Sequence, residues 1–91
     1  MAVPTCIIER KNAGATTENL LSAARILTGS AFKLYIYFTT FPIGRTTYRR
    51  VYFERATDMV VLTINTAFSE LVNKNYLTKI DNDVYSFNEK G

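Results

Sequence analysis

The stretch from Phe53 to Leu77, FERATDMVVLTINTAFSELVNKNYL, decides the fold that we expect for this chain. Within it, four apolar residues recur at the i, i+3, i+4, i+7 spacing of a helix that buries one face. These residues are Ile64, Ala67, Phe68 and Leu71. The pattern predicts a helix that follows a short break near Asp58 and runs to about Lys74.

The residues before this break predict another helix. Phe41–Gly44, with the sequence FPIG, has the composition of a turn. Thr46 or Thr47 can then cap a helix that runs from Tyr48 to about Thr57. Two helices joined by a short break are thus expected in the second half of the chain.

The residues after Lys74 predict a β-hairpin. Two runs rich in strand-forming residues, Tyr76–Ile80 and Val84–Phe87, flank the sequence Asp81-Asn82-Asp83. Two neighbouring carboxylates could hold a metal ion or act as an acid and a base, but Asx residues favour tight turns because their side chains bond to the local backbone. We therefore expect a solvated turn here and no metal site.

The N-terminal part predicts a strand and then a helix. Cys6–Arg10 is short and contains two β-branched residues, and a loop composition follows it. Thr16 or Thr17 can cap the helix, and Gly29 is expected to end it.

The segment Ala31–Phe38 is apolar nearly all round, as is a helix in the centre of a small domain. Its Tyr, Ile and Phe residues also favour a strand. We prefer the helix, because Ser30 can cap it and because the run extends almost to Pro42.

Composition limits the chemistry that this chain can perform. The 91 residues contain no histidine and one cysteine, Cys6, which removes histidine-based catalysis, Cys–His nucleophiles and most zinc sites. We therefore expect no enzyme activity, no metal and no cofactor, and we expect Cys6 to pack in the first strand without reacting. The net charge of +3 permits a polyanionic partner without requiring one.

Length and termini set the expected organisation. Residues 1–91 are of a size for one domain. Met1–Lys11 lacks the pattern of a signal peptide, and the longest apolar run, Ala31–Ile43, is too short and too interrupted to span a bilayer. We expect one domain in the reducing cytoplasm, and a homodimer, because a chain this small buries only a modest core.

The quoted stretch resembles the helix-turn-helix of winged-helix DNA-binding proteins, of the small regulator or replication-associated type found in phages and plasmids. In that family the recognition helix ends in a leucine, and a Gly-Tyr-Leu or Gly-Tyr-Ile sequence starts the wing. Leu71 and Asn75-Tyr76-Leu77 occupy these places, and asparagine tolerates the left-handed conformation that the glycine supplies. Leu27–Tyr35 is similar to the start of the family's central helix. The resemblance covers roughly residues 17–88 and implies a winged helix-turn-helix, mainly α with a small β component.

The resemblance also implies a DNA-binding site on the two helices. Four arginines would contact phosphates, and four polar residues of the second helix would read base edges. The phosphate candidates are Arg45, Arg49, Arg50 and Arg55, and the base candidates are Thr63, Asn65, Thr66 and Ser69. Val60–Ser69 holds no Arg, Lys, Gln or Glu, and the acidic tip of the wing would be repelled by phosphates.

These residues also have structural interpretations. The arginines could form a solvated helix face, with Arg50 pairing with Glu54 at i, i+4. Val61 and Leu62 could cover the core, contact thymine methyl groups or meet a protein. The tyrosines could stack on bases, but we favour packing in the core with wet hydroxyls. They are Tyr35, Tyr37, Tyr48 and Tyr52.

The sequence therefore predicts a protein that binds double-stranded DNA as a homodimer. It would serve a mobile element as a small transcription regulator, a partition factor or a replication accessory protein. The alternative is a phage-encoded inhibitor that binds a host protein on the same scaffold, such as an anti-CRISPR protein, because a fold alone does not fix a function.

Overall fold

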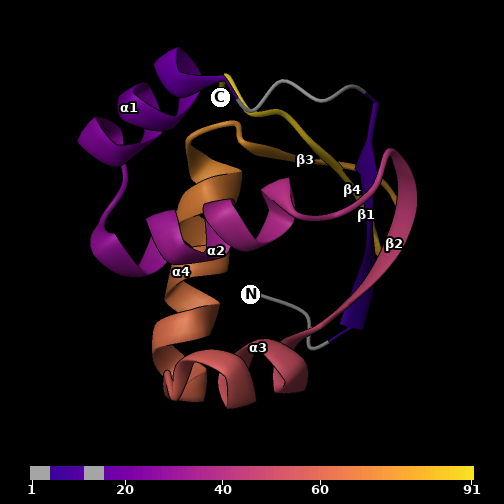
Figure 1. The fold of residues 1–91 in the computed structure, drawn as a ribbon. Helices are drawn as coiled ribbons and strands as arrows, with labels where there is room; N and C mark the ends of the chain where they lie inside the picture. The colour runs from indigo at the N-terminus through magenta and orange to yellow at the C-terminus, as the bar shows by residue number, and fades with distance from the viewer. Residues whose placement is uncertain (1–4, 12–15) are drawn as a thin grey trace.

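Within residues 5–11 and 16–91, which the computed structural model describes, the chain forms four helices and one four-stranded sheet (Figure 1). In chain order the elements are β1 (Thr5–Arg10), α1 (Thr17–Ile26), α2 (Gly29–Thr39), β2 (Gly44–Arg49), α3 (Arg50–Thr57), α4 (Val61–Asn73), β3 (Leu77–Asp81) and β4 (Val84–Phe87). The helices hold more residues than the strands, as expected, but the fold is α/β with a larger sheet than the sequence predicted. No helix in these residues is long and apolar enough to cross a membrane.

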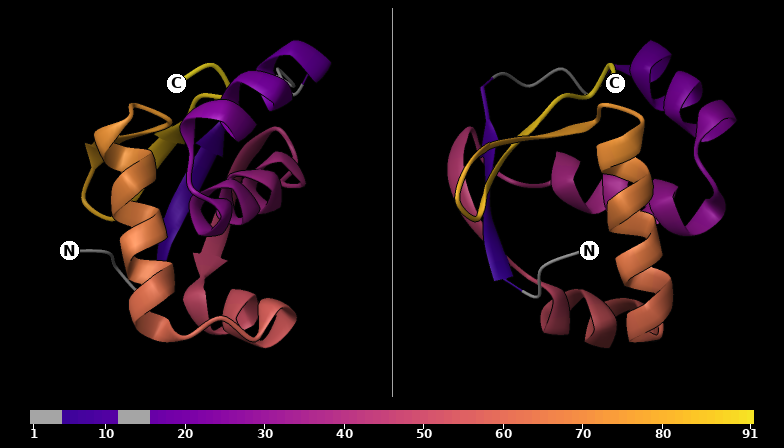
Figure 2. Two further views of the ribbon diagram at one scale, coloured as in Figure 1. Left: turned by 90° about the vertical axis from the view of Figure 1, so that its left-hand side faces the viewer. Right: turned by 180° about the vertical axis from the view of Figure 1, so that it is seen from behind.

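The sheet is mixed, and its first strand lies in the interior. The strand order is β2-β1-β4-β3. β1 runs antiparallel to β2 and parallel to β4, while β3 and β4 form the predicted antiparallel hairpin. The helices lie on one side of the sheet, with α1 and α3 at opposite ends of the helical layer (Figure 1, Figure 2). β1 therefore joins the C-terminal hairpin to the strand in the middle of the chain.

The core between helices and sheet consists largely of aromatic rings. Tyr35 and Tyr76 meet edge to face with ring centres 5.3 Å apart, and Phe38 meets Tyr48 in the same way at 5.3 Å. Such pairs stabilise the fold beyond the burial of the rings themselves. The predicted apolar stripe of α4 is confirmed, because all four of its residues are buried. They are Ile64, Ala67, Phe68 and Leu71.

The predicted helix over Ala31–Phe38 is confirmed as part of α2, but its expected start was wrong. The side chain of Thr28, not that of Ser30, accepts the capping hydrogen bond, which comes from the N–H of Ala31 at 3.4 Å. Gly29 is accordingly the first residue of α2 and does not end α1. The earlier start depends on a residue distant in sequence, because a carboxylate of α4 accepts hydrogen bonds from the capping residue Thr28.

Glu70 of α4 fixes Thr28 at the start of α2. Its carboxylate accepts a hydrogen bond from the N–H of Thr28 at 2.8 Å and one from its hydroxyl at 2.9 Å. No local signal near Thr28 indicates this partner, which lies on another helix. α1 is simpler, since Thr16 accepts a bond from the N–H of Asn19 at 3.1 Å and is one of its two predicted caps.

The predicted helix from Tyr48 is wrong in its first part. Gly44–Arg49 forms the strand β2, and the helix α3 begins only at Arg50. Thr46 and Thr47 therefore cap nothing, and they pair with Ile8 and Ile7 of β1. The β-branched threonines and the ladder formed with β1 override the capping pattern, because β pairing satisfies the backbone along the whole segment.

Three residues with positive φ end or connect elements where the sequence predicted breaks. Asp58 has φ of 56° between α3 and α4, Asn75 has φ of 68° before the hairpin, and Asp83 has φ of 55° in its turn. The carboxylate of Asp81 accepts a hydrogen bond from the N–H of Asn82 at 2.8 Å, which is the local turn chemistry expected. The described residues contain no group of His, Cys, Asp and Glu that could hold a metal ion.

A buried arginine connects three segments that are distant in sequence. Arg10, at the end of β1, donates to the carboxylate of Glu89 at 3.2 Å and to the carbonyl of Thr39 at 2.9 Å. It also donates to the carbonyl of Phe41, just after α2. Both members of the ion pair are almost fully buried. Arg10 thus holds the end of β1, the end of α2 and the C-terminal segment together.

Replacing Glu89 by alanine is expected to lower the free energy of unfolding by about 3 kcal/mol, because it leaves a buried guanidinium without its carboxylate. Urea denaturation followed by circular dichroism measures this change. Lys90→Ala is the matched control, since it alters the exposed neighbour and should change stability little. Equal effects of the two substitutions would contradict the assigned role of the pair.

Candidate nucleic-acid interface

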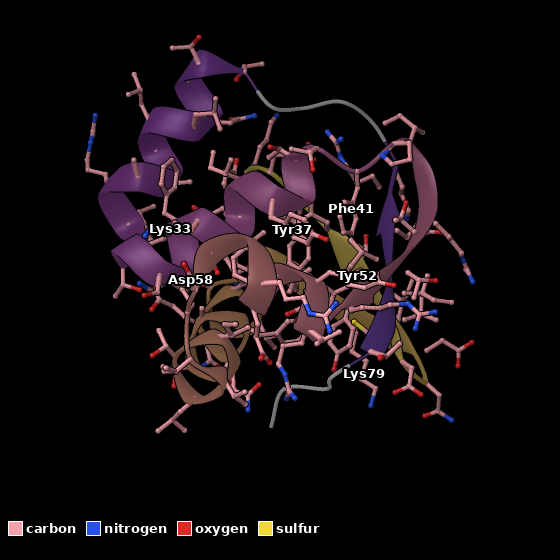
Figure 3. All side chains as sticks on the ribbon, turned by 60° about the horizontal axis from the view of Figure 1, so that its bottom comes forward. Lys33, Tyr37, Phe41, Tyr52, Asp58 and Lys79 are labelled. Atoms are coloured by element: carbon pink, nitrogen blue, oxygen red, sulfur yellow. The ribbon has the colours of Figure 1, made fainter. Side chains whose placement is uncertain are left out.

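α3 and α4 are consecutive helices that a short turn joins at one end of the molecule. Residues 58–60 connect the two helices, and the left-handed backbone at Asp58 turns the chain between them. α3 lies beside the N-terminal end of α4 in each ribbon view (Figure 1, Figure 2). In Figure 3, which shows the α3 end of the molecule, Tyr52 and Asp58 lie toward opposite ends of α3. The arrangement leaves one face of α4 open to solvent.

The base-reading candidates lie along this outer face of α4. At 100° per residue, Asn65 and Ser69 fall on one flank of the face and Thr63 on the other, with Thr66 between them. Burial agrees, because Thr66 is exposed and the three flanking residues are half-buried. The predicted set therefore forms a polar arc, which the exposed side chain of Leu62 interrupts between Ser69 and Thr66.

Two members of the arc differ in how they are held. The hydroxyl of Thr66 donates to the carbonyl of Leu62 at 3.0 Å, one turn earlier in the helix. The Oδ1 atom of Asn65 is buried and has no hydrogen-bond partner among the described residues. An unsatisfied buried oxygen is destabilising. Asn65 is thus the member of the arc whose side-chain oxygen accepts no hydrogen bond within the described residues.

The four candidate arginines do not form one group. Arg45 lies in β2, where it forms an ion pair with Glu9 at 3.2 Å. Arg50, the first residue of α3, forms the predicted i, i+4 ion pair with Glu54 at 2.9 Å. The sequence predicted all four arginines in a helix or just before it, but Arg45 and Arg49 lie in the strand β2.

Arg49 and Arg55 differ from the other two because no carboxylate in the described part of the chain pairs with them. Arg49, the last residue of β2, lies over the ring of Tyr52 at 5.9 Å. Arg55 is exposed in the last turn of α3. These two guanidinium groups lie at the two ends of α3, Arg55 at the end that leads to α4, and both are available to an anionic ligand.

The start of α4 is apolar and exposed. Leu62 is 76% exposed, and its neighbours Val60 and Val61 are exposed as well. Of the three sequence interpretations of Val61 and Leu62, burial in the core is therefore wrong. Three consecutive apolar residues at the start of a helix cannot all lie on one buried stripe, which is the sequence signal that would have indicated an apolar patch here.

The aromatic and thiol candidates mostly serve the core. Tyr35 and Tyr48 are buried, and desolvation raises the pKa of Tyr35 to about 12. Tyr37 is half-buried, whereas Tyr52 is 56% exposed and is not a core residue. Cys6 is buried, and desolvation, with a smaller effect of nearby Asp83, raises the pKa of its thiol to about 12. A thiol in that environment is a packing group and not a nucleophile at neutral pH.

Comparisons of this chain with protein-family models, with curated proteins and with solved structures yield no match.

Replacing Asn65 by leucine, which has a similar shape, is expected to raise the free energy of unfolding by about 1 kcal/mol, because it removes a buried oxygen that has no partner. Urea denaturation of the variant and the wild type measures the change. Ser69→Ala, one turn further along the same flank, is the control and should have little effect. A loss of stability in the leucine variant would show that Oδ1 has a partner in solution.

Proposed function

We propose that this protein is a winged helix-turn-helix protein that binds double-stranded DNA through the outer face of α4. Its order of elements supports this proposal: α3, a turn at Asp58, α4, a left-handed Asn75 and a hairpin follow one another. A helix-turn-helix unit places its second helix in the major groove. The observation that carries the proposal is the polar arc of α4, preceded by a helix whose two ends carry arginines without a carboxylate partner among the described residues.

Affinity would come from the arginines. A guanidinium that contacts a phosphate releases condensed counterions, and this contribution does not depend on the base sequence. Arg49 and Arg55 can contribute without first losing an ion pair, whereas Arg45 and Arg50 would have to leave Glu9 and Glu54. We therefore assign the main phosphate contacts to Arg49 and Arg55.

Sequence preference would come from the arc of α4. The amide of Asn65 can bond to adenine in the major groove once its side chain turns outward, and exposed Leu62 can contact a thymine methyl group. The wing, which is the β3–β4 hairpin, is not expected to contact the phosphates of DNA, because its turn carries the carboxylates of Asp81 and Asp83. Recognition would thus rest on α4, with a regulator, a partition factor or a replication accessory protein as the biological setting.

The double variant Arg49→Ala, Arg55→Ala is expected to bind all duplexes more weakly and to lower the slope of log K against log salt by about 2, because two phosphate contacts are lost. Titration of fluorescent duplexes at several salt concentrations measures both effects. The control is Arg25→Ala with Lys90→Ala, which removes the same charge from α1 and the C-terminus, at the opposite end of the molecule (Figure 1). Equal loss of binding in both double variants would mean that net charge, not this site, attracts DNA. No binding by the folded wild type at low salt would eliminate the proposal.

The exposed start of α4 favours a second function, an inhibitor that binds a host protein. An apolar patch formed by Val60, Val61 and Leu62 is a surface typical of protein contacts, in which a few buried apolar residues supply most of the affinity. Such an inhibitor, for example an anti-CRISPR protein of a phage, would use the same end of the molecule without reading DNA.

Leu62→Lys distinguishes the two functions because its effects have opposite directions. A new cation beside DNA should tighten binding to random duplexes, for which the thymine-methyl contact of Leu62 does not matter, whereas a charge in an apolar protein contact should abolish the complex. The measurements are duplex titration and a pull-down from a lysate of the native host, with Arg25→Ala as the control. A protein captured by the wild type and by the control but not by Leu62→Lys, together with no DNA binding, would establish the second function.

A further inference from the structure

β2 is an edge strand whose outer side is unoccupied by any described part of the chain. The strand pairs with β1 on one side, and the sheet ends there. Neighbouring residues of a strand direct their N–H and C=O groups to opposite sides, so one half of these groups in β2 points away from the sheet. No hydrogen bond to these outward groups is found within residues 5–11 and 16–91. In Figure 1, β2 lies at the margin of the sheet, and no other labelled strand or helix lies beyond it.

The two edge strands of the sheet, β2 and β3, differ in how strongly they discourage the addition of a further strand. β3, the other edge, has an irregular register between Lys79 and Asp81 and carries a lysine, and both features discourage the addition of a further strand. β2 pairs with β1 in a regular register over Gly44–Arg49 and contains neither proline nor lysine. Its two arginines lie on the exposed face of the sheet, where Arg45 is paired with Glu9, and a regular edge of six residues is a template for another strand.

We propose that the outer edge of β2 pairs, antiparallel, with β2 of a second copy of this chain, so that two sheets join into one. The occupant must be an extended backbone, because only a strand satisfies a row of alternating N–H and C=O groups. Antiparallel pairing of two identical strands requires a two-fold axis, and an axis normal to the sheet keeps the core-facing residues of both copies on one face.

The residues of β2 fit this pairing. Thr46 lies on the core-facing side of the strand, so a register with Thr46 opposite Thr46 of the other copy is allowed. Arg45 then faces Thr47, and Arg49 faces Ile43, so no arginine faces another arginine. Opposed threonines form a favourable cross-strand pair.

Exposed apolar residues at the two ends of β2 indicate a second copy in preference to an unrelated strand. Ile43 precedes the strand and is 56% exposed, while Val51 follows it and is 44% exposed. In an antiparallel pair, the start of one strand lies beside the end of the other. The two-fold axis therefore brings Ile43 of each copy to the Arg49–Val51 end of its partner, where both apolar side chains gain cover.

Light scattering coupled to size-exclusion chromatography, over a range of protein concentrations and without DNA, tests the proposal. The wild type is expected to approach twice the chain mass of 10.3 kDa as its concentration rises. Ile43→Lys should give a folded monomer. Ile80→Lys is the matched control, because Ile80 is 46% exposed on the other edge strand and its substitution should leave the dimer intact. A wild type that stays at 10.3 kDa up to its solubility limit, or equal behaviour of the two lysine variants, overturns the proposal.

Proline substitutions test the backbone contacts themselves. Thr46 and Thr47 are adjacent, so one directs its N–H to β1 and the other directs it outward. Thr46→Pro and Thr47→Pro remove these two donors separately. The variant that keeps its fold has lost the outward donor and should be monomeric, and a folded proline variant that remains dimeric overturns the proposal. Neither result depends on DNA, so failure here is separate from failure of the proposed function.

Discussion

The burial of the Arg10 guanidinium is the constraint on which the rest of the arrangement depends. A buried cation is tolerated only where acceptors surround it, and here one carboxylate and two carbonyls accept hydrogen bonds from Nε and Nη1 of Arg10. These acceptors belong to the C-terminal segment and to the end of α2. β1 is therefore fixed between the hairpin and β2, and this position makes β2 an edge strand and leaves its last residue, Arg49, directly before α3.

The position of β2 also determines the position of the candidate nucleic-acid interface, because β2, α3 and α4 follow one another directly along the chain. β2 leads into α3 without a loop, so pairing with β1 determines where α3 begins and where Arg49 and Arg50 lie. The αL residue Asp58 then sets α4 against the helical layer, where its apolar stripe is buried and its polar arc is left outside. Glu70 completes the arrangement from the far end of α4 by holding Thr28. The open face of α4 is thus produced by contacts on its other faces.

Features that depend on neighbours in the sequence could be predicted, and features that depend on distant partners could not. The stripe of α4 and the left-handed Asn75 follow from local periodicity and from the conformational tolerance of asparagine. β2 was missed, although Thr46 and Tyr48 alternate with exposed Thr47 and Arg49, because a strand gains its hydrogen bonds only when β1 is beside it. Arg10 and Glu89 lie 79 residues apart, and no local pattern links them. Likewise, the sequence indicated four arginines but not that two of them are paired with carboxylates.

The two proposed surfaces use different parts of the fold and can operate together. The outward backbone of β2 faces away from the sheet, whereas α4 packs on α2 and near β3, at the other side of the molecule. Arg49 is the residue where the surfaces approach each other, because it ends β2 and precedes α3. Pairing through β2 would use the backbone of Arg49 and would leave its guanidinium over the ring of Tyr52 in α3. A dimer formed in this way would present two α4 helices related by a two-fold axis, which is the symmetry of a DNA site built from two half-sites.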